Sequence, residues 1–463
     1  MNDEQLARPI TLLGGVAIIV GAVIGIGIFV QVAPITAQAG SGTWLAVTIA
    51  IIVSLIGVVP LIQIASALPR AGGGYIYGSR LLSPVWGALT SFWAILGGAS
   101  STAVVAWGMA FFTAPLLPFE VPLNLVAVAW PLAFWVLYLF GLKLAMWVQI
   151  IMAAHMILGL LFYIGFVSAQ VPIDFSIELT QGMGGFLVGC ILCYSVCMGF
   201  QVVAELGEEM KNAQRNIPIS LLIGGIVVWL LYGATTLLFV QTVPLDPDAL
   251  RAMDRPLVNS AQGLMPPYLI TFMWLGGISA GLTSFNASAI ALPREILAMA
   301  RDRVLPGYLA HLGENTHSPL RAVSAFFVVA LSLTFFGEQI AALLGVASVL
   351  DLFGVMAGTG ILMLTIIISV AALRLPTVMR ERYESAFFRL PIPVLYATVA
   401  LSILSAGGFV FVVVSELPTV MAVYGVYTVG ILIYYFLRVR WLKANGVDWG
   451  EVQARIPGFD EER

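Results

Sequence analysis

Two closely spaced glycines, Gly25 and Gly27, interrupt an apolar run that extends from about Ile10 to Ala39. Each glycine costs a helix about 1 kcal/mol relative to alanine, so a helix is expected to break here. In hydrocarbon, the backbone groups left unpaired by a break are tolerated only where they line a polar cavity or lie inside the protein. The interruption therefore indicates a binding site near the membrane midplane. The alternative, which the residues leave open, is close packing of another helix against small side chains.

The composition places these glycines in an integral membrane protein. Of the 463 residues, 60% are hydrophobic and 10% are charged, against about 25% charged in ordinary soluble domains. With three histidines and three cysteines, the chain lacks the clustered side chains that an enzyme site or a metal centre needs. We therefore expect no enzyme, metal or cofactor. The lipid bilayer is an expected partner and nucleic acid is not.

The apolar runs predict twelve membrane-spanning helices, at about 20 residues per span. They lie near 10–38, 43–67, 85–113, 121–141, 146–170, 183–206, 217–241, 267–299, 322–337, 341–373, 391–415 and 417–438. With both termini in the cytoplasm, every Lys and Arg except Arg251 and Arg255 falls on the cytoplasmic side, as the positive-inside rule requires. The plasma (inner) membrane is the expected location, with 1–9 and 439–463 as cytoplasmic ends.

A second interruption suggests that the chain repeats. The stretch from Ser195 to Gly199 lies in the middle of the sixth apolar run. Helices 1 and 6 then open two blocks of five helices, 10–170 and 183–373, and an odd number of helices inverts the second block. Inverted repeats with a broken first helix are typical of one class of secondary transporters. Helices 11 and 12, within 391–438, are additional.

Four motifs in register resemble the amino acid–polyamine–organocation (APC) superfamily. They are the glycine motif Gly21–Phe29, the loop Leu68–Tyr77, the segment Glu208–Pro218, and Arg294–Pro306 followed by Ser318-Pro319. The family's usual Pro is Ala213 here. This resemblance implies an all-α, LeuT-type fold with a substrate site between broken helices 1 and 6.

The resemblance assigns the substrate site to the two breaks. N–H groups near Gly27 would receive an α-carboxylate, because a helix N-terminus carries about half a positive charge. Carbonyls from Val196 to Met198 would accept hydrogen bonds from an ammonium group, and Gly199 would allow close backbone approach. The expected substrate-binding residues are Ile24, Gly25, Ile26, Gly27, Tyr194, Ser195, Val196, Cys197, Met198 and Gly199.

Departures from the family pattern concern the gates of this site. Ile26 replaces a residue that is usually small or hydroxyl-bearing, and Ser195 and Cys197 stand where aromatic gates are common. Tyr194 is the nearest aromatic residue. The expected gate residues are Phe200, Trp107, Trp274 and Glu205. Glu205, Glu208 and Glu209 are also expected to pair with Lys211, Arg215 or the arginines after helix 8, which would close the cytoplasmic side.

The coupling mechanism depends on His155 in helix 5. Some relatives carry a proton-coupling Lys in this helix, and Met156 aligns with it, beside His155. Histidine titrates near physiological pH, so His155 is the candidate proton-coupling group. The alternative is a neutral packing histidine. Sodium has weaker support, because helix 1 offers only carbonyls opposite Ser284 and Ser288.

These observations predict an amino acid permease that works by alternating access as a proton-coupled symporter. There are two alternatives: an uncoupled exchanger of amino acids or amines, and a transport-inactive amino-acid sensor on the same fold. All three cysteines, Cys190, Cys193 and Cys197, fall within helix 6, so no disulfide-linked partner is expected. The expected assembly is a monomer or a weak homo-oligomer.

Overall fold

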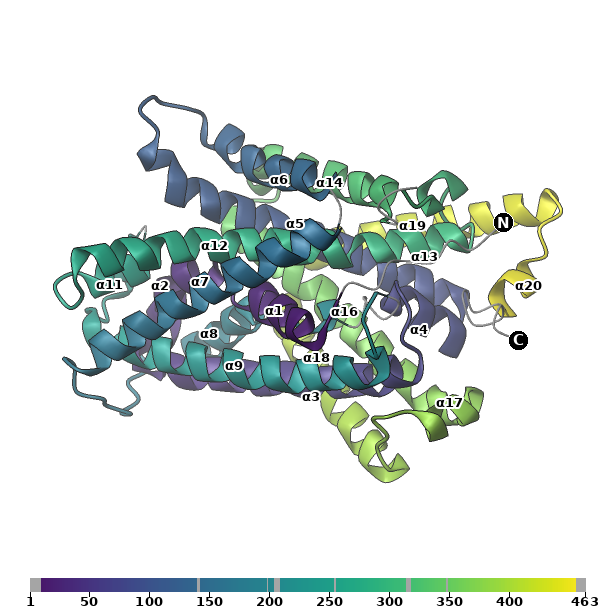
Figure 1. Cartoon of the computed structure of the whole chain (residues 1–463), viewed down its shortest axis with the longest axis horizontal. Helices are drawn as coiled ribbons and strands as arrows, with labels where there is room; N and C mark the ends of the chain where they lie inside the picture. The colour runs from purple at the N-terminus through teal and green to yellow at the C-terminus, as the bar shows by residue number, and fades with distance from the viewer. Residues whose placement is uncertain are drawn as a thin grey trace.

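The computed structural model of the chain describes residues 10–139, 142–197, 199–203, 209–253, 255–313, 318–346 and 349–454. The regular secondary structure of this part of the chain is helical, apart from one isolated parallel bridge between Ile10 and Met210. Figure 1 shows long helices running side by side along one axis, with the short helices α4 (Gly73–Leu81), α17 (Arg380–Ser385) and α20 (Trp449–Ala454) at one end.

The longer helices follow the predicted apolar runs. They are α1 (Leu12–Val23), α2 (Gly27–Ala39), α3 (Thr43–Ala67), α5 (Pro84–Thr113), α6 (Leu123–Leu139), α7 (Leu142–Ser168), α8 (Gly182–Val196), α9 (Ala213–Thr242), α12 (Pro267–Ala291), α13 (Pro293–Arg301), α14 (Leu320–Phe335), α16 (Val349–Val378), α18 (Ile392–Glu416) and α19 (Pro418–Ala444). Short elements connect them: η1 (Gly40–Gly42), η2 (Ala114–Leu116), η3 (Phe200–Val203), α10 (Pro247–Arg251), α11 (Pro256–Ala261), η4 (Gly307–Ala310) and α15 (Gly337–Leu343).

Within the described ranges, eight helical segments are long and apolar enough to cross a membrane. The pair α14 and α15, bent by 62°, would make a ninth if it forms one span. Each of the twelve predicted intervals overlaps at least one helix. The largest difference in boundary is at the tenth interval, where the bend after Phe336 separates α15 and the long helix α16 begins at Val349 rather than 341.

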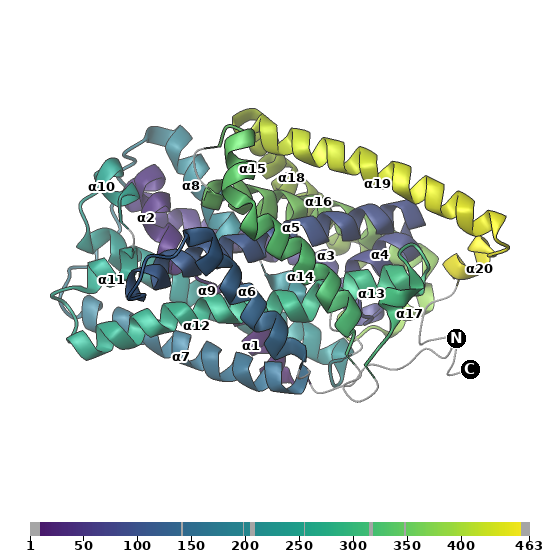
Figure 2. The ribbon, with the colours of Figure 1, turned by 90° about the horizontal axis from the view of Figure 1, so that it is seen from above.

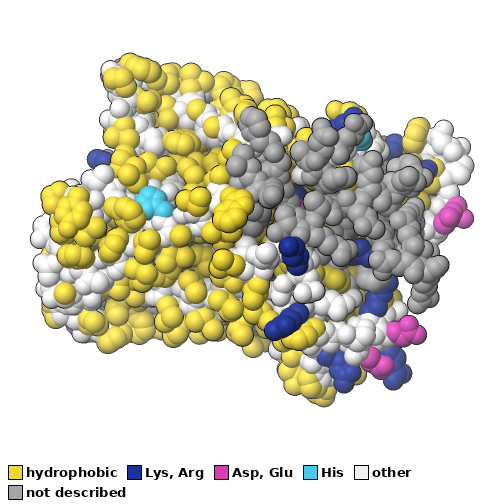
Figure 3. All heavy atoms as spheres, viewed as in Figure 1, with side chains coloured by type: hydrophobic (Ala, Val, Ile, Leu, Met, Phe, Trp, Pro, Cys, Tyr) yellow, Lys and Arg dark blue, Asp and Glu magenta, His cyan; other side chains and the backbone are white. Residues whose placement is uncertain are grey.

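The outer surface is largely apolar, as a protein surrounded by lipid requires. In Figure 3, hydrophobic side chains cover much of the part of the face away from α17 and α20, and most of the visible charged side chains, with more Lys and Arg than Asp and Glu, lie at the end that holds these two helices. Figure 2 shows α19 along the outside of the bundle. Large side chains on α18 and α19 are strongly exposed, including Leu404 (72%), Phe411 (70%) and Val426 (76%).

Buried ion pairs hold the charged end of the bundle together. Arg294 on α13 donates to both carboxylate oxygens of Glu209, at 2.6 and 2.9 Å, and to the hydroxyl of Tyr138 on α6 at 2.9 Å. Arg80 on α4 pairs with Asp302 at 2.7 Å. The expected pairing of an acid after helix 6 with an arginine after helix 8 is therefore confirmed for Glu209.

Candidate functional site

The first helix is broken where the glycines predict. The helix α1 ends at Val23, the N–H of Ile24 still donates to the carbonyl of Val20, and α2 begins at Gly27. No side chain caps α2, whose N-cap residue is Ile26. The first N–H groups of a helix have no partner within it. The break therefore presents the amides of Gly27 and Ile28 at a positively polarised helix end.

The sixth predicted span is also broken. The helix α8 ends at Val196 with Cys197 as its C-cap, and η3 begins at Phe200. Between them Gly199 has a φ of +134°, a backbone conformation that residues other than glycine rarely adopt. A Cβ atom on Gly199 would lie 2.9 Å from the carbonyl carbon of Ala22. The second break thus needs glycine both for its conformation and for its approach to α1.

The structure brings the two breaks into contact. A Cβ added to Gly27 would lie 2.8 Å from a methyl carbon of Val196. Behind the first break, a Cβ on Gly25 would lie 2.3 Å from the hydroxyl oxygen of Ser284 on α12. The hydroxyl of Thr283 donates to the carbonyl of Gly21 at 3.1 Å. Gly25, Gly27, Val196 and Gly199 therefore belong to one junction of α1, α2, α8 and α12.

A cavity of about 80 Å³ extends from this junction. Its wall includes Ala22, Gly199 and Ser284 at the junction and continues along α12 and α13 past Ser288 to Glu295. The other lining residues come from α5, η3, α12 and α16 and are small or aliphatic. A volume of this size holds several water molecules. Of the expected substrate-binding residues that the structure describes, Gly199 is the one that lines this cavity.

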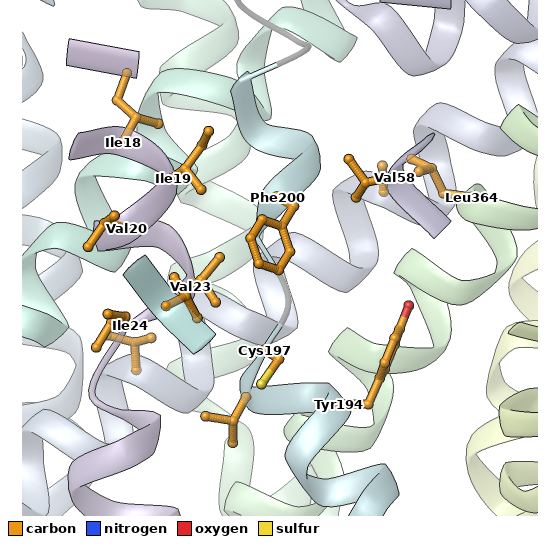
Figure 4. Close-up of a cluster of buried hydrophobic side chains, with 14 of the residues drawn as sticks. Ile18, Ile19, Val20, Val23, Ile24, Val58, Tyr194, Cys197, Phe200 and Leu364 are labelled. Atoms are coloured by element: carbon orange, nitrogen blue, oxygen red, sulfur yellow. The ribbon is translucent and has the colours of Figure 1, made fainter. Parts of the chain in front are cut away.

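Three other expected residues line a second, smaller cavity, which shares the lining residue Leu364 with the first. Tyr194, Cys197 and Phe200 surround a space of about 20 Å³ between α3, α8 and α16. Figure 4 places the Phe200 ring between Val23 of α1 and Val58 of α3, whereas the Tyr194 hydroxyl points away from α1. The Tyr194 ring packs against Phe409 of α18 at 4.9 Å between centroids. Tyr194 is thus turned from the first break toward α18.

The isoleucines of the first break are both buried. A Cβ on Gly108 of α5 would lie 3.2 Å from Ile26, so Ile26 packs against α5. The structure describes only the helical backbone of Ser195, and Met198 and Glu205 lie outside the described residues.

The aromatic gate candidates lie at different depths. Trp107 of α5 is fully buried and donates through its indole N–H to the carbonyl of Thr334 at 3.1 Å, which attaches it to the end of α14. Trp274 of α12 is half-buried. Neither residue lines the cavity of about 80 Å³.

His155 lies between α7 and α12. Its Nδ1 is 2.8 Å from the hydroxyl oxygen of Ser279, and its ring meets Phe272 edge-on at 4.4 Å. It does not line the cavity. The three cysteines of α8 and its C-cap are buried and free, and the described residues contain no group of His, Cys, Asp and Glu suited to a metal ion.

Two buried polar features escaped the sequence interpretation. Gln149 of α7 donates to the carbonyl of Ala17 at 3.1 Å and accepts from Asn286 of α12 at 3.0 Å, so two amides join three helices behind the first break. Glu295 is fully buried at the far end of the cavity. The sequence does contain a sign of both features, because these polar residues lie within or beside apolar spans. Polar groups at such positions mark functional or structural sites.

Comparisons with known proteins agree with this architecture. The family model described as amino acid permease matches residues 14–446. An uncharacterized transporter of Mycobacterium tuberculosis is 29% identical over 72% of this chain and 75% of that protein. The vacuolar cationic amino acid transporter 2 of Arabidopsis thaliana is 28% identical over 84% of this chain and 64% of its own length. The branched-chain amino acid permease BcaP of Bacillus subtilis is 24% identical over 81% of each chain.

The matched family and these relatives are transporters, which confirms the prediction that the chain is not an enzyme. The family match covers nearly the whole described chain, including both helix breaks, and confirms the APC resemblance of the four sequence motifs. The chain belongs to the amino acid permease family.

Proposed function

We propose that this chain is a twelve-span permease with the LeuT-type inverted repeat, and that it carries amino acids across the plasma membrane by alternating access. The observation that supports this most is the junction of two helix breaks. There Gly199 meets Ala22, Gly27 meets Val196, and a cavity begins. Clustered positive charge at one end supports cytoplasmic termini.

The breaks suit the two charged groups that all free amino acids share. An α-carboxylate fits the uncapped start of α2, where the amides of Gly27 and Ile28 point away from their own helix. An α-ammonium fits the carbonyl end of α8 near Val196 and Cys197, which carries the negative end of that helix dipole. This arrangement recognises a zwitterion through the backbone and leaves the side chain to the cavity.

Proton-coupled symport is the coupling mode that we propose, with His155 as the proton carrier. The observation that supports this role is its contact with Ser279, which places His155 against α12, the helix whose Ser284 stands behind Gly25. Exchange without protons is the second candidate. It is favoured by the position of His155 outside the cavity.

The test is uptake of a panel of radiolabelled amino acids into proteoliposomes that contain the purified chain. We expect uptake to rise with an inward proton gradient and to lose this response in His155→Ala. Uptake that ignores the gradient but requires amino acid inside the vesicles would replace symport by exchange. No uptake of any amino acid under either condition would contradict the proposed function.

A further inference from the structure

A bridge of two amides holds α1, the first half of the broken first span. Gln149 of α7 and Asn286 of α12 are fully buried. The side-chain nitrogen of Gln149 donates to the carbonyl of Ala17 on α1 at 3.1 Å, and that of Asn286 donates to the side-chain oxygen of Gln149 at 3.0 Å. Such side chains join helices within a membrane by hydrogen bonds. The amide bridge thus attaches α1 to α7 and α12 at once.

Gly21 leaves the space that the amide bridge occupies. A Cβ atom on Gly21 would collide with the side-chain nitrogen of Gln149 and would lie 2.8 Å from the Cβ of Thr283. Gly21 lies within α1 and is not among the glycines with a positive φ. The first glycine of the motif Gly21–Phe29 is therefore needed for the approach of α7 and α12 rather than for its backbone conformation.

Polar contacts join α1 and the residues beside it to α7, α12 and α13 at three levels. At the charged end of the bundle, Arg294 pairs with Glu209, whose carbonyl accepts from the N–H of Ile10 just before α1. The amide bridge at Ala17 is the middle level. At the break, the hydroxyl of Thr283 donates to a carbonyl in the last turn of α1 at 3.1 Å. The helix α1 therefore leads from the charged end to the break and is held along its whole length.

These contacts differ in what their loss leaves behind. Ala17 lies inside α1, where its carbonyl already accepts from an N–H group four residues later. Gly21 lies in the last turn, whose carbonyls have no partner within the helix. Its hydrogen bond from Thr283 satisfies a carbonyl that would otherwise be unpaired in the membrane interior. Gln149 can therefore release Ala17 without leaving a carbonyl of α1 unpaired, whereas Thr283 cannot release Gly21 in this way.

A further attachment of α1 is to α9. The hydroxyl of Tyr232 donates to the carbonyl of Val23 at 2.8 Å, and that of Ser220 donates to the carbonyl of Leu12 at 3.4 Å. Figure 1 shows α1 in the middle of the bundle, and its neighbours include α7, α9 and α12. Because α9 holds α1 near both of its ends, α1 stays with α9 when its bond to Gln149 breaks.

The strength of the amide bridge suits a contact that is made and broken. A hydrogen bond between membrane helices changes an equilibrium about threefold on average and about twentyfold at most. Two such bonds therefore favour the attached position of α1 about tenfold. A difference of this size is typical of conformations that exchange with one another.

We propose that Gln149 is a positioning residue for transport: it holds α1 against α7 and α12 while the permease is closed to the cytoplasm, and it releases α1 when that side opens. The inference rests on the proposed function, since it assumes alternating access with the charged end in the cytoplasm. During release Thr283 stays bound to Gly21, so the break keeps its geometry while the charged end of α1 moves. Arg294 and Glu209 separate in the same step and reach cytoplasmic water.

The first measurement is the exposure of Ala17, which is buried and lies one turn before Gly21 on the same face of α1. A thiol at Ala17→Cys should react when α1 has moved away from α7. The full-length chain is reconstituted in proteoliposomes, and its alkylation by N-ethylmaleimide is followed by mass spectrometry of the peptide. This readout separates the new thiol from the buried native cysteines. The same chain is compared with and without Gln149→Met or Tyr232→Phe.

Gln149→Met keeps the length of the side chain and removes its two hydrogen bonds, so alkylation should become about fivefold faster or more. Tyr232→Phe is the matched control. It also removes a buried hydrogen bond to α1, but from α9, which moves with α1, so the rate should change by less than about twofold. An unchanged rate in Gln149→Met, or an equal rise in both variants, would overturn the proposal.

The second measurement is the uptake kinetics of the amino acid that the wild-type chain takes up best. A chain that spends more time open to the cytoplasm binds outer substrate less often. Gln149→Met should therefore raise KM about fivefold and change kcat by less than about twofold. A purely structural role would lower kcat at an unchanged KM, and this result would overturn the proposal. Absence of uptake by the wild-type chain would contradict the proposed function alone, because the alkylation rates do not require transport.

Discussion

At the residue scale, Gly199 is the position where the proposed site tolerates least change. Its φ of +134° and the 2.9 Å from an added Cβ to the carbonyl carbon of Ala22 both oppose a side chain. Gly199→Ala should therefore separate the two breaks, reduce amino acid uptake at least about tenfold and cost about 1–3 kcal/mol of stability. Uptake per mole of reconstituted protein and the thermal midpoint in detergent would measure the two effects.

The matched control is Gly233→Ala on α9. This glycine has no atom within 4 Å of an added Cβ and lies in ordinary helix. Alanine there should leave uptake unchanged and stabilise the helix by up to about 1 kcal/mol. If Gly199→Ala behaved like Gly233→Ala, the close contact of the two breaks would not matter for transport.

The same scale shows what the sequence could reveal. Gly25, Gly27 and Gly199 predicted the helix breaks because glycine acts on its own backbone, and such local effects are visible in sequence. The direction of Tyr194 and the cavity position of Glu295 depend on packing with α18 and α4. Glu295 and its donor Gly74 are 221 positions apart, and no local pattern indicates that contact.

At the element scale, the pair of Arg294 and Glu209 joins α13 and α6 to the segment before α9. Both side chains are almost completely buried. Removing one partner leaves the other charge buried and uncompensated, so Glu209→Gln should lower stability by about 3–5 kcal/mol. The thermal midpoint of the purified protein in detergent is the measurement.

A double variant separates the ion pair from simple packing. Replacement of a buried pair by apolar residues is often neutral, so Glu209→Leu with Arg294→Met should be more stable than Glu209→Gln alone. A double variant no more stable than Glu209→Gln would show that Arg294 acts mainly through Tyr138 and the carbonyl of Ala289.

The order of the helices was predictable at this scale from the length of the apolar runs, whereas the 62° bend between α14 and α15 was not.

At the scale of the whole molecule, the distribution of charge determines how the proposed permease lies in the membrane. Arg380 and Arg382 lie in α17 and Arg389 follows it, whereas Asp246 and Asp248 accompany Arg251 at α10. Because basic loops stay in the cytoplasm, a cysteine at Glu384 should resist an impermeant maleimide in intact cells, and a cysteine at Gln262, after α11, should react. Both native side chains are exposed, so access to the reagent depends on the side of the membrane. Labelling at Glu384→Cys with protection at Gln262→Cys would invert the orientation and place Glu295, with the charged end of the cavity, on the outer side.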